Sequence, residues 1–209
     1  MIFCDAGNSV VSIYAANGAC KSYEPLAFEQ EFKPQGRVYF INVNERLKNY
    51  FAKYEQFIDL EPLVEFKTSY QGLGIDRKLA CLSVEDAAII DAGSAITIDI
   101  MSSGLHLGGT ILPGLGAYRK AYKDISSVLD KELVTKINLS AYPQSTAGAI
   151  SWGVLHSIIS CIKTLACDKS LIFTGGDGSF LASFFDKGIY NKILIYQGFC
   201  LVARRLNLK

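Results

Sequence analysis

The chain is organised around the stretch Asp91-Ala-Gly-Ser-Ala-Ile-Thr-Ile-Asp-Ile100, whose opening repeats the first turn of the chain, Asp5-Ala-Gly-Asn-Ser9. Each copy follows a short apolar strand and continues into a β-branched strand that ends at a glycine, Gly18 or Gly104. Runs of this kind on both sides of a Gly-containing turn are typical of β-hairpins. The sequence therefore predicts the same hairpin twice.

The turn of such a hairpin is suited to binding phosphate. Glycine has no Cβ, so it can leave backbone N–H groups open to an anion. The carboxylates of Asp5 and Asp91 are acceptors suited to a hydrated Mg²⁺ that bridges to phosphate oxygens. Two ordinary type I′ or II′ turns would also favour Asp and Gly. The presence of two copies favours a clamp that holds the polyphosphate of a nucleotide from both sides.

The composition is that of an ordinary globular protein of one or two domains, with 209 residues, of which 50% are hydrophobic. The net charge of +1 argues against a nucleic-acid-binding surface. We expect no membrane-spanning run and find no charged leader before an apolar segment, so we expect a cytoplasmic protein. The six cysteines show no Cys-x-x-Cys spacing and there are only two histidines, which argues against a structural zinc site.

Beyond the hairpins, expected strands alternate with expected helices, as is typical of an α/β protein. The expected strands are 37–43, 57–60, 63–66, 169–174 and 193–196. The expected helices are 44–54, 117–133, 147–166, 179–185 and 199–206.

Three loops between these elements carry candidate site residues. Asp76 follows a glycine-rich loop and could cap a helix, or it could be a base beside the anion-binding guanidinium of Arg77. Thr146 is expected to cap the helix 147–166. The turn Gly175-Gly176 would let a flat heterocycle or a ribose approach the backbone closely.

A family resemblance unites these segments. Three of them, taken in order, resemble the two phosphate motifs and the adenosine motif of the superfamily that contains actin, heat-shock chaperones and sugar kinases: Asp5-Ala-Gly-Asn-Ser9, Asp91-Ala-Gly-Ser-Ala95 and Thr174-Gly-Gly-Asp-Gly178. Within this superfamily the chain resembles the type III pantothenate kinases, which phosphorylate pantothenate with ATP at the first step of coenzyme A synthesis. Four further segments carry that likeness: Gly74-Ile-Asp-Arg77, Thr97-Ile-Asp99, Gly108-Gly-Thr-Ile-Leu-Pro-Gly114 and Ser145-Thr-Ala-Gly-Ala-Ile-Ser-Trp-Gly153.

The resemblance implies a fold of two related ribonuclease H-like domains, with mixed sheets flanked by helices and an ATP cleft between them. The first domain would comprise residues 1–84 and the second residues 85–209. The closing helix 199–206 could pack back on the first domain.

The resemblance also implies roles for individual residues. Asp76 would be the general base, and the residues that contact pantothenate would be Tyr70, Gly74, Arg77 and Thr146. The family is homodimeric, and Thr146 would reach pantothenate in its own or in the partner subunit's site. ATP would be held by Asp5, Gly7, Asn8, Ser9, Gly93, Ser94, Ala95, Gly175 and Gly176. Asp5 would hold the Mg²⁺ and phosphate side, and Asp91, the second metal-site residue, would contribute to the phosphate end and to a site for a monovalent cation, K⁺ or NH₄⁺.

The chain departs from the family pattern at two places. The family has a threonine where Ser9 stands and a lysine further along the first hairpin, which residues 10–16 lack, and its substrate-binding tyrosine lies further upstream of Asp76 than Tyr70 does. Two other functions fit the superfamily: a different small-molecule kinase, or a non-catalytic nucleotide-binding regulatory protein. The presence of all three carboxylates, Asp5, Asp76 and Asp91, favours a working kinase.

Overall fold

The computed structural model describes residues 1–208, which form two compact units. Unit 1 comprises Met1–Glu85, Met101–Gly108 and the residues from Ile193 onward, and unit 2 comprises Asp86–Ile100 and Gly109–Lys192.

Unit 1 is built on a mixed five-stranded sheet with the order β3-β2-β1-β4-β5. The strands are β1 (Ile2–Ala6), β2 (Val11–Ala15), β3 (Cys20–Tyr23), β4 (Val38–Asn42) and β5 (Phe57–Asp59). Strand β1 runs antiparallel to β2 and parallel to β4, which in turn runs parallel to β5. The predicted first hairpin, β1 and β2, thus lies in the middle of the sheet.

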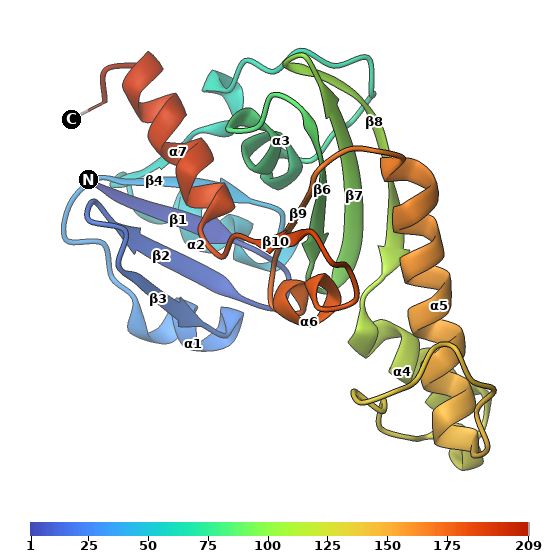
Figure 1. Ribbon diagram of the computed structural model, residues 1–209. Helices are drawn as coiled ribbons and strands as arrows, with labels where there is room; N and C mark the ends of the chain where they lie inside the picture. The colour runs from blue at the N-terminus through green and yellow to red at the C-terminus, as the bar shows by residue number, and fades with distance from the viewer. Residues whose placement is uncertain (209) are drawn as a thin grey trace. The chain divides into compact units, whose positions relative to one another are not determined.

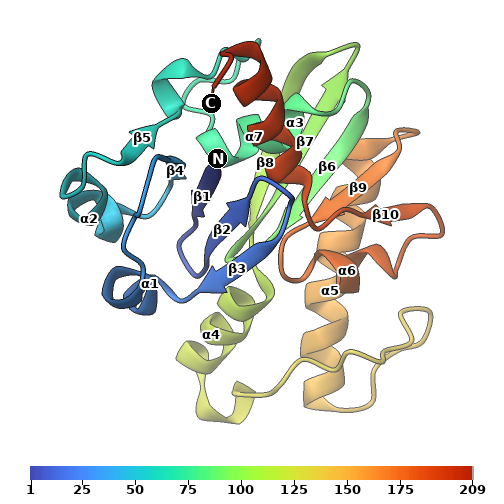
Figure 2. The same cartoon turned by 90° about the vertical axis from the view of Figure 1, so that its left-hand side faces the viewer.

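Alternate side chains of β1 enter different cores, because successive residues of a strand point to opposite faces. Phe3 packs with α3 (Ile75–Leu82) and α7 (Leu194–Arg205), which lie side by side in Figure 1. Cys4 and Ala6 pack with α1 (Pro25–Glu31) and α2 (Lys48–Ala52), shown from another side in Figure 2. Two short 3₁₀ helices, η1 (Glu45–Leu47) and η2 (Glu61–Leu63), complete the unit.

The second sheet has the order β10-β9-β6-β7-β8. Its strands are β6 (Ala87–Ala92), β7 (Ala95–Ser102), β8 (Leu105–Pro113), β9 (Leu171–Thr174) and β10 (Gly188–Tyr190). The helices of unit 2 are α4 (Leu115–Ile125), η3 (Ser127–Leu129), α5 (Thr146–Ala166) and α6 (Gly178–Ala182). Its core is formed by β-branched residues of β6 and β7, such as Ile90 and Ile98, against Ile158 and Ile162 of α5.

The two sheets repeat one topology. Read from β8, the second sheet runs β8-β7-β6-β9-β10, which matches β3-β2-β1-β4-β5 element by element. In both, the hairpin strand pairs on one side with its hairpin partner and on the other with a parallel strand that arrives later in the chain. The duplication therefore extends beyond the hairpins, and the expected α/β architecture with two related mixed sheets is confirmed.

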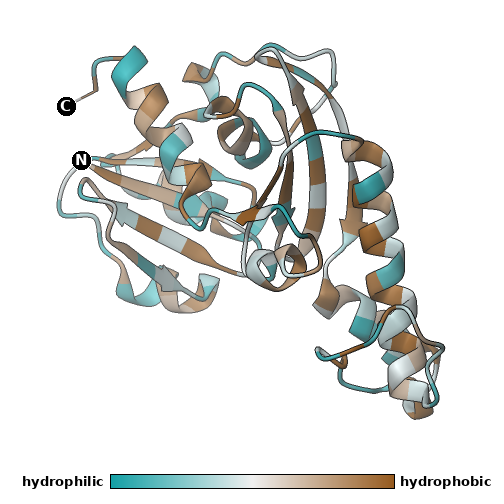
Figure 3. Cartoon of the chain, viewed as in Figure 1, coloured by the Kyte–Doolittle hydropathy of each residue, from teal (hydrophilic) through white to brown (hydrophobic). Residues whose placement is uncertain are grey.

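Helix α5 corrects the expectation that no segment is long and apolar enough to cross a membrane. Its 21 residues pass that test by length and composition, with a mean hydropathy of 1.4. However, eight of its side chains are buried, and apolar residues at four-residue spacing face the core of unit 2. Brown and teal bands alternate along α5 in Figure 3. Its apolar character is therefore explained by its position as the core helix of unit 2.

Several predicted elements were wrong in extent or type. Residues 193–196, expected as a strand, belong largely to α7, and residues 63–66 form no strand. The helix expected at 117–133 ends at Ile125, and β3 and α1 lie outside the strands and helices that the sequence predicts. Helix α7 forms because its rings pack on unit 1: Phe199 stacks on Phe3 at 4.9 Å, and Tyr196 stacks on Tyr14 at 5.3 Å. Tertiary packing thus outweighs the strand preference of the local sequence.

Candidate functional site

The first hairpin turn presents polar residues directly after a buried strand. Asp5 is the fourth residue of β1, paired with Ser12 on one side and Ile41 on the other. The N–H of Gly7 donates to the carbonyl of Val10 at 3.0 Å, so this amide closes the turn. Asn8 and Ser9, which follow, are exposed at the tip. Glycine suits this position because a Cβ on residue 7 would lie only 2.9 Å from the Val10 carbonyl oxygen.

Asn44, a residue that the sequence analysis did not single out, fixes this turn from outside. It is 6% exposed and follows β4. Its Nδ2 donates to the carbonyl oxygens of Gly7 at 3.1 Å and Asn8 at 3.4 Å, while its Oδ1 accepts from the N–H of Arg46 at 3.1 Å. One buried amide therefore connects the tip of the first hairpin to the start of η1, and the only signal in the sequence is an asparagine just after a strand.

The second hairpin turn is supported by backbone contacts from two glycine-containing segments of unit 2, one at Gly114 and one at Gly175. The N–H of Gly93 donates to the carbonyl of Ala95 at 2.9 Å, so this glycine also uses its amide within the turn. A Cβ at Gly114 would lie 2.3 Å from the carbonyl oxygen of Gly93, and the N–H of Gly114 donates to the carbonyl of Ser94 at 3.1 Å. Gly93, Ser94 and Ala95 remain exposed at the tip.

The turn after β9 lies directly against Asp91. Asp91 pairs with Thr174 in the parallel ladder, and a Cβ at Gly175 would lie 2.4 Å from the Asp91 Oδ1. Gly175 has φ +83°, a conformation that favours glycine. Asp177 donates its N–H to the Ala92 carbonyl at 2.9 Å, and burial raises the pKa of its carboxyl. The predicted second phosphate turn and the predicted adenosine turn are therefore neighbours in unit 2.

The carboxylates fit a metal ion that arrives with a nucleotide. Among residues 1–208, no group of three or more His, Cys, Asp or Glu side chains could hold a metal ion. Asp5 in unit 1 and Asp91 in unit 2 each offer a single carboxylate. One carboxylate is compatible with Mg²⁺, which is usually held by one or two carboxylates together with phosphates and water. Burial, and then the charge of Asp5, raise the pKa of the neighbouring Cys4 thiol well above its usual value. Cys4 therefore stays neutral and does not compete as a ligand.

Asp76 lies in the first turn of α3 and is not its cap. Gly74 is the N-cap residue and makes no side-chain capping bond. The Asp76 Oδ1 accepts the N–H of Arg77 at 2.8 Å, so the carboxylate folds back over the start of the helix. A Cβ at Gly74 would lie 2.6 Å from that oxygen, which explains the need for glycine. The helix dipole favours the ionised carboxylate at this position.

Arg77 and Tyr70 form a stacked pair beside Asp76. The Arg77 guanidinium carbon lies 4.9 Å from the Tyr70 ring centroid, and Arg77 is only 6% exposed. A buried cation over an aromatic face is held more firmly than one in water. The backbone N–H of Tyr70 donates to Thr68 Oγ1 at 3.0 Å. The structure therefore brings Tyr70, Gly74, Asp76 and Arg77 together within unit 1.

Thr146 begins α5 but does not cap it. Ser145 is the N-cap, and its Oγ accepts the N–H of Gly148 at 3.1 Å. Thr146 is exposed in the first turn. The loop before it is tied to α5, because Trp152 Nε1 donates to the Leu139 carbonyl at 3.1 Å. The threonine hydroxyl is therefore not needed for capping, contrary to expectation.

Comparison with known proteins gives a consistent result. The family model described as "Type III pantothenate kinase" matches residues 42–168. A type III pantothenate kinase of Campylobacter jejuni (strain RM1221) is 49% identical over 200 residues, covering 95% of this chain and 94% of the relative. The same enzyme of Helicobacter hepaticus is 45% identical, covering 95% of this chain and 96% of the relative.

Solved structures show the same fold. A Campylobacter jejuni protein solved under the name of a Baf family transcriptional activator superposes with a TM-score of 0.90 at 44% identity, over 99% of both chains. A 2-dehydro-3-deoxygalactonokinase-like protein of Sinorhizobium meliloti superposes with a TM-score of 0.59 at 8% identity, over 100% of this chain and 99% of that one. The second likeness concerns the fold alone.

Proposed function

The chain belongs to the type III pantothenate kinase family, and from that membership we propose how its residues share the work of the reaction. The protein phosphorylates pantothenate in coenzyme A biosynthesis, and kinases of this kind use ATP with a divalent metal ion. When bound, the metal ion neutralises charge on the phosphate oxygens. The other requirements of phosphoryl transfer are that the protein position the two substrates and stabilise the charge of the transition state.

We propose that Asp76 is the general base. It would take the proton of the primary hydroxyl of pantothenate as that oxygen bonds to the γ-phosphorus of ATP and the bond from phosphorus to the leaving ADP oxygen breaks. The observation that carries this proposal is the position of the Asp76 carboxylate beside the buried Arg77–Tyr70 pair. Arg77 and Tyr70 would hold the acceptor, and Gly74 would give it room at the start of α3.

The two hairpin turns are the proposed phosphate-binding segments. On the first, Asp5, Gly7, Asn8 and Ser9 would face the phosphates and Mg²⁺, and on the second, Gly93, Ser94 and Ala95. Gly175 and Gly176 would contact the adenosine. The support is that each turn is exposed at its tip and is hydrogen-bonded by a segment that follows another strand of its sheet, namely Asn44 after β4 and Gly114 after β8. Asp91 is the proposed partner of a K⁺ or NH₄⁺ ion. Its carboxylate lies close to Gly175, where a Cβ would be 2.4 Å from the Asp91 Oδ1.

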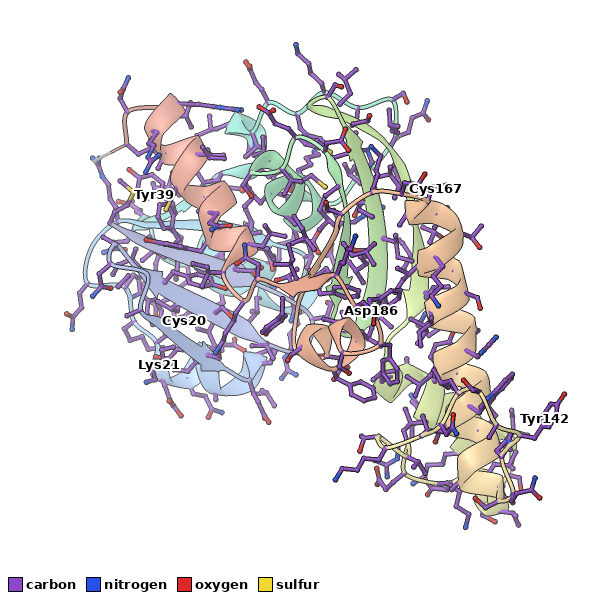
Figure 4. All side chains as sticks on the ribbon, in the orientation of Figure 1. Cys20, Lys21, Tyr39, Tyr142, Cys167 and Asp186 are labelled. Carbon is purple, nitrogen blue, oxygen red and sulfur yellow. The ribbon has the colours of Figure 1, made fainter. Side chains whose placement is uncertain are left out.

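We also propose a homodimer in which Thr146 contacts pantothenate. Unit 2 exposes several large apolar side chains before α5: Ile125 is 72% exposed and Val128 is 66% exposed. Tyr142, labelled in Figure 4, projects away from α5 and is 88% exposed. Apolar exposure of this kind is typical of association surfaces.

Two further proposals concern the chain as a whole. The proposed ancestral duplication covers residues 1–84 and 85–209, as the repeated strand order suggests. The proposed compartment is the cytoplasm, where ATP is available.

An ADP-release assay tests these assignments together. Purified protein with ATP, Mg²⁺ and K⁺ is expected to release ADP only when pantothenate is added, and to slow when K⁺ is replaced by Na⁺. A panel of sugars and acetate distinguishes a kinase of another specificity. ADP release without dependence on pantothenate, or none at all, would favour the regulatory role suggested by the name of the Campylobacter jejuni structure.

Replacement of Asn44 should weaken ATP binding selectively. Asn44→Ala removes two hydrogen bonds to the first hairpin tip, at 3.1 and 3.4 Å, and leaves the carbonyl oxygens of Gly7 and Asn8 without this donor. A loss of this kind costs about 1–3 kcal/mol. We expect the KM for ATP to rise about tenfold, while the KM for pantothenate stays nearly unchanged. Steady-state kinetics with each substrate varied in turn measure both constants.

The matched control is Asn17→Ala, also in unit 1. The Asn17 Oδ1 accepts the N–H of Ala19 at 3.1 Å in the turn between β2 and β3. This variant loses a comparable turn contact and should keep both KM values. If Asn44→Ala raised the two KM values equally, or only lowered the melting temperature, its proposed role in positioning the first hairpin would be wrong.

A further inference from the structure

The loop that carries Tyr70 has little regular structure to hold it in place. Residues 64–74, all of which the structure describes, form neither a helix nor a strand. Two glycines lie between Tyr70 and the start of α3, and Gly72 has φ +70°, in the region that favours glycine. An aromatic side chain that holds a substrate from such a loop needs support from residues outside the loop.

One such support joins the loop to the start of β8. Thr68 and His106 form an isolated parallel bridge, and the backbone N–H of His106 donates to the carbonyl of Lys67 at 3.5 Å. The two side chains also meet, with Thr68 Oγ1 2.8 Å from His106 Nδ1. His106 is only 3% exposed, so this contact lies in the interior of unit 1.

The Thr68–His106 pair contacts both the backbone and the ring of Tyr70. Thr68 Oγ1 accepts the backbone N–H of Tyr70 at 3.0 Å. The imidazole centroid of His106 lies 6.1 Å from the ring centroid of Tyr70 and 5.7 Å from that of Phe66. A hydroxyl carries one hydrogen and two lone pairs, so Thr68 Oγ1 can bond the Tyr70 amide and the imidazole together. The position of Tyr70 is therefore set by the same two residues at its backbone and at its ring.

Tyr70 in turn contacts the residues proposed to bind and activate the acceptor. Its ring centroid lies 4.9 Å from the Arg77 guanidinium carbon, and Arg77 is only 6% exposed. The backbone N–H of Arg77 donates to Asp76 Oδ1 at 2.8 Å. A continuous set of contacts thus runs from His106 and Thr68 through Tyr70 and Arg77 to the proposed base.

We propose that Thr68 and His106 are positioning residues for pantothenate binding, because they hold Tyr70 in the orientation in which it stacks on Arg77. The proposal rests on the proposed function, in which Tyr70 contacts the acceptor. Loss of the pair would let Tyr70 leave the face of Arg77, and part of the binding energy of pantothenate would then be used to order the loop. A pair with a purely structural role would instead lower the melting temperature and leave the KM for pantothenate unchanged.

The test is a double-mutant cycle on the KM for pantothenate. Thr68→Val keeps the shape of the side chain and removes its hydrogen bonds to Tyr70 and His106, whereas Tyr70→Ala removes the ring that the pair holds. We expect Thr68→Val to raise the KM for pantothenate about tenfold, as for an amide left without its acceptor. The kcat and the KM for ATP should stay within about twofold of wild type. In the Tyr70→Ala background, Thr68→Val should change the KM for pantothenate by less than about twofold, because residues that act through one another are not additive.

Three further variants identify the atoms responsible. Thr68→Ser keeps the hydroxyl and should retain the wild-type KM for pantothenate. His106→Phe keeps a ring between Phe66 and Tyr70 but has no Nδ1, and should raise this KM about threefold, since Thr68 still accepts the Tyr70 amide. Ser69→Ala, which removes the neighbouring exposed hydroxyl, is the matched control and should change none of the constants.

The outcomes separate this role from the proposed function. An equal rise in the KM for pantothenate with and without the Tyr70 ring would overturn the positioning role, and an unchanged KM in His106→Phe would overturn the part of His106. If Tyr70→Ala raised this KM and Thr68→Val did not, only the positioning role would be wrong. If Tyr70→Ala left it unchanged, Tyr70 would not contact the acceptor, and the positioning role would fall with that assignment. All these variants keep Asp76, so the comparison does not depend on which residue is the base.

Discussion

Asp76→Asn is expected to lower kcat for pantothenate phosphorylation by about 10²–10⁴-fold, the usual contribution of a general base. Asparagine keeps the Oδ1 that accepts the N–H of Arg77 at 2.8 Å, so the start of α3 should remain intact. It cannot accept the proton of the attacking hydroxyl. The KM for ATP should change little. Steady-state kinetics, together with a thermal melt to verify folding, measure the effect.

Asp59→Asn is the matched control for this variant. Asp59 is also an aspartate of unit 1 whose Oδ1 accepts a backbone N–H, that of Glu61 at 2.9 Å. The two substitutions therefore remove the same charge from similar local settings. Activity of Asp59→Asn should stay within about twofold of wild type, since surface substitutions usually change little. Comparable activity of Asp76→Asn and wild type would exclude Asp76 as the base.

Gly175→Ala should strongly destabilise unit 2. The residue has φ +83°, which costs an alanine about 1–2 kcal/mol. The new Cβ would also lie 2.4 Å from Asp91 Oδ1 and 2.5 Å from the Ala92 carbonyl oxygen, both of which would have to move. We expect the free energy of unfolding to fall by about 2–4 kcal/mol. ATP binding should weaken as well, because Asp91 and the second turn are displaced.

The adjacent glycine provides the control. A Cβ at Gly176 would meet no atom within 4 Å, and this residue is not among the glycines with positive φ. Gly176→Ala should therefore change the free energy of unfolding by no more than about 0.5 kcal/mol. Chemical denaturation of the two variants under the same conditions gives the comparison. Equal destabilisation would show that the contact with Asp91 is not the cause.

The duplicated architecture was predictable from sequence because turn residues are chemically restricted. The repeated Asp-Ala-Gly opening indicated both hairpins, and the structure places each in the middle of a sheet. The remaining equivalence, between β4 with β5 and β9 with β10, leaves no trace in the sequence. Buried strands need only apolar residues of suitable size, so sequence can diverge while topology persists.

The start of α7 was mispredicted because its sequence favours the wrong local structure. The run Ile193-Leu-Ile-Tyr196 has the β-branched and aromatic content of a strand. In the structure the helix approaches α3 so closely that a Cβ at Gly198 would lie 2.2 Å from the Leu79 carbonyl oxygen. A contact between residues so far apart in the chain cannot be read from local pattern.

Candidate site residues could be predicted from the sequence where a role needs an unusual residue in an unusual place. They could not be predicted where a residue acts only by holding another segment in position. Asp76, Arg77 and the glycines could be singled out as candidates because charge beside a flexible turn is unusual. Asn44 was missed because a buried amide acts through contacts made 36 and 37 residues away in the sequence.

The packing of α7 on β1 has a consequence for biosynthesis. Phe3 is covered by Phe199, and Tyr14 by Tyr196, so the amino-terminal strands leave the ribosome long before the rings that shield them. At ordinary translation rates this interval is roughly 10–40 s. During that time the nascent chain carries an open, aromatic sheet face. This face of the sheet can therefore be covered by its native partners only once α7 is synthesised.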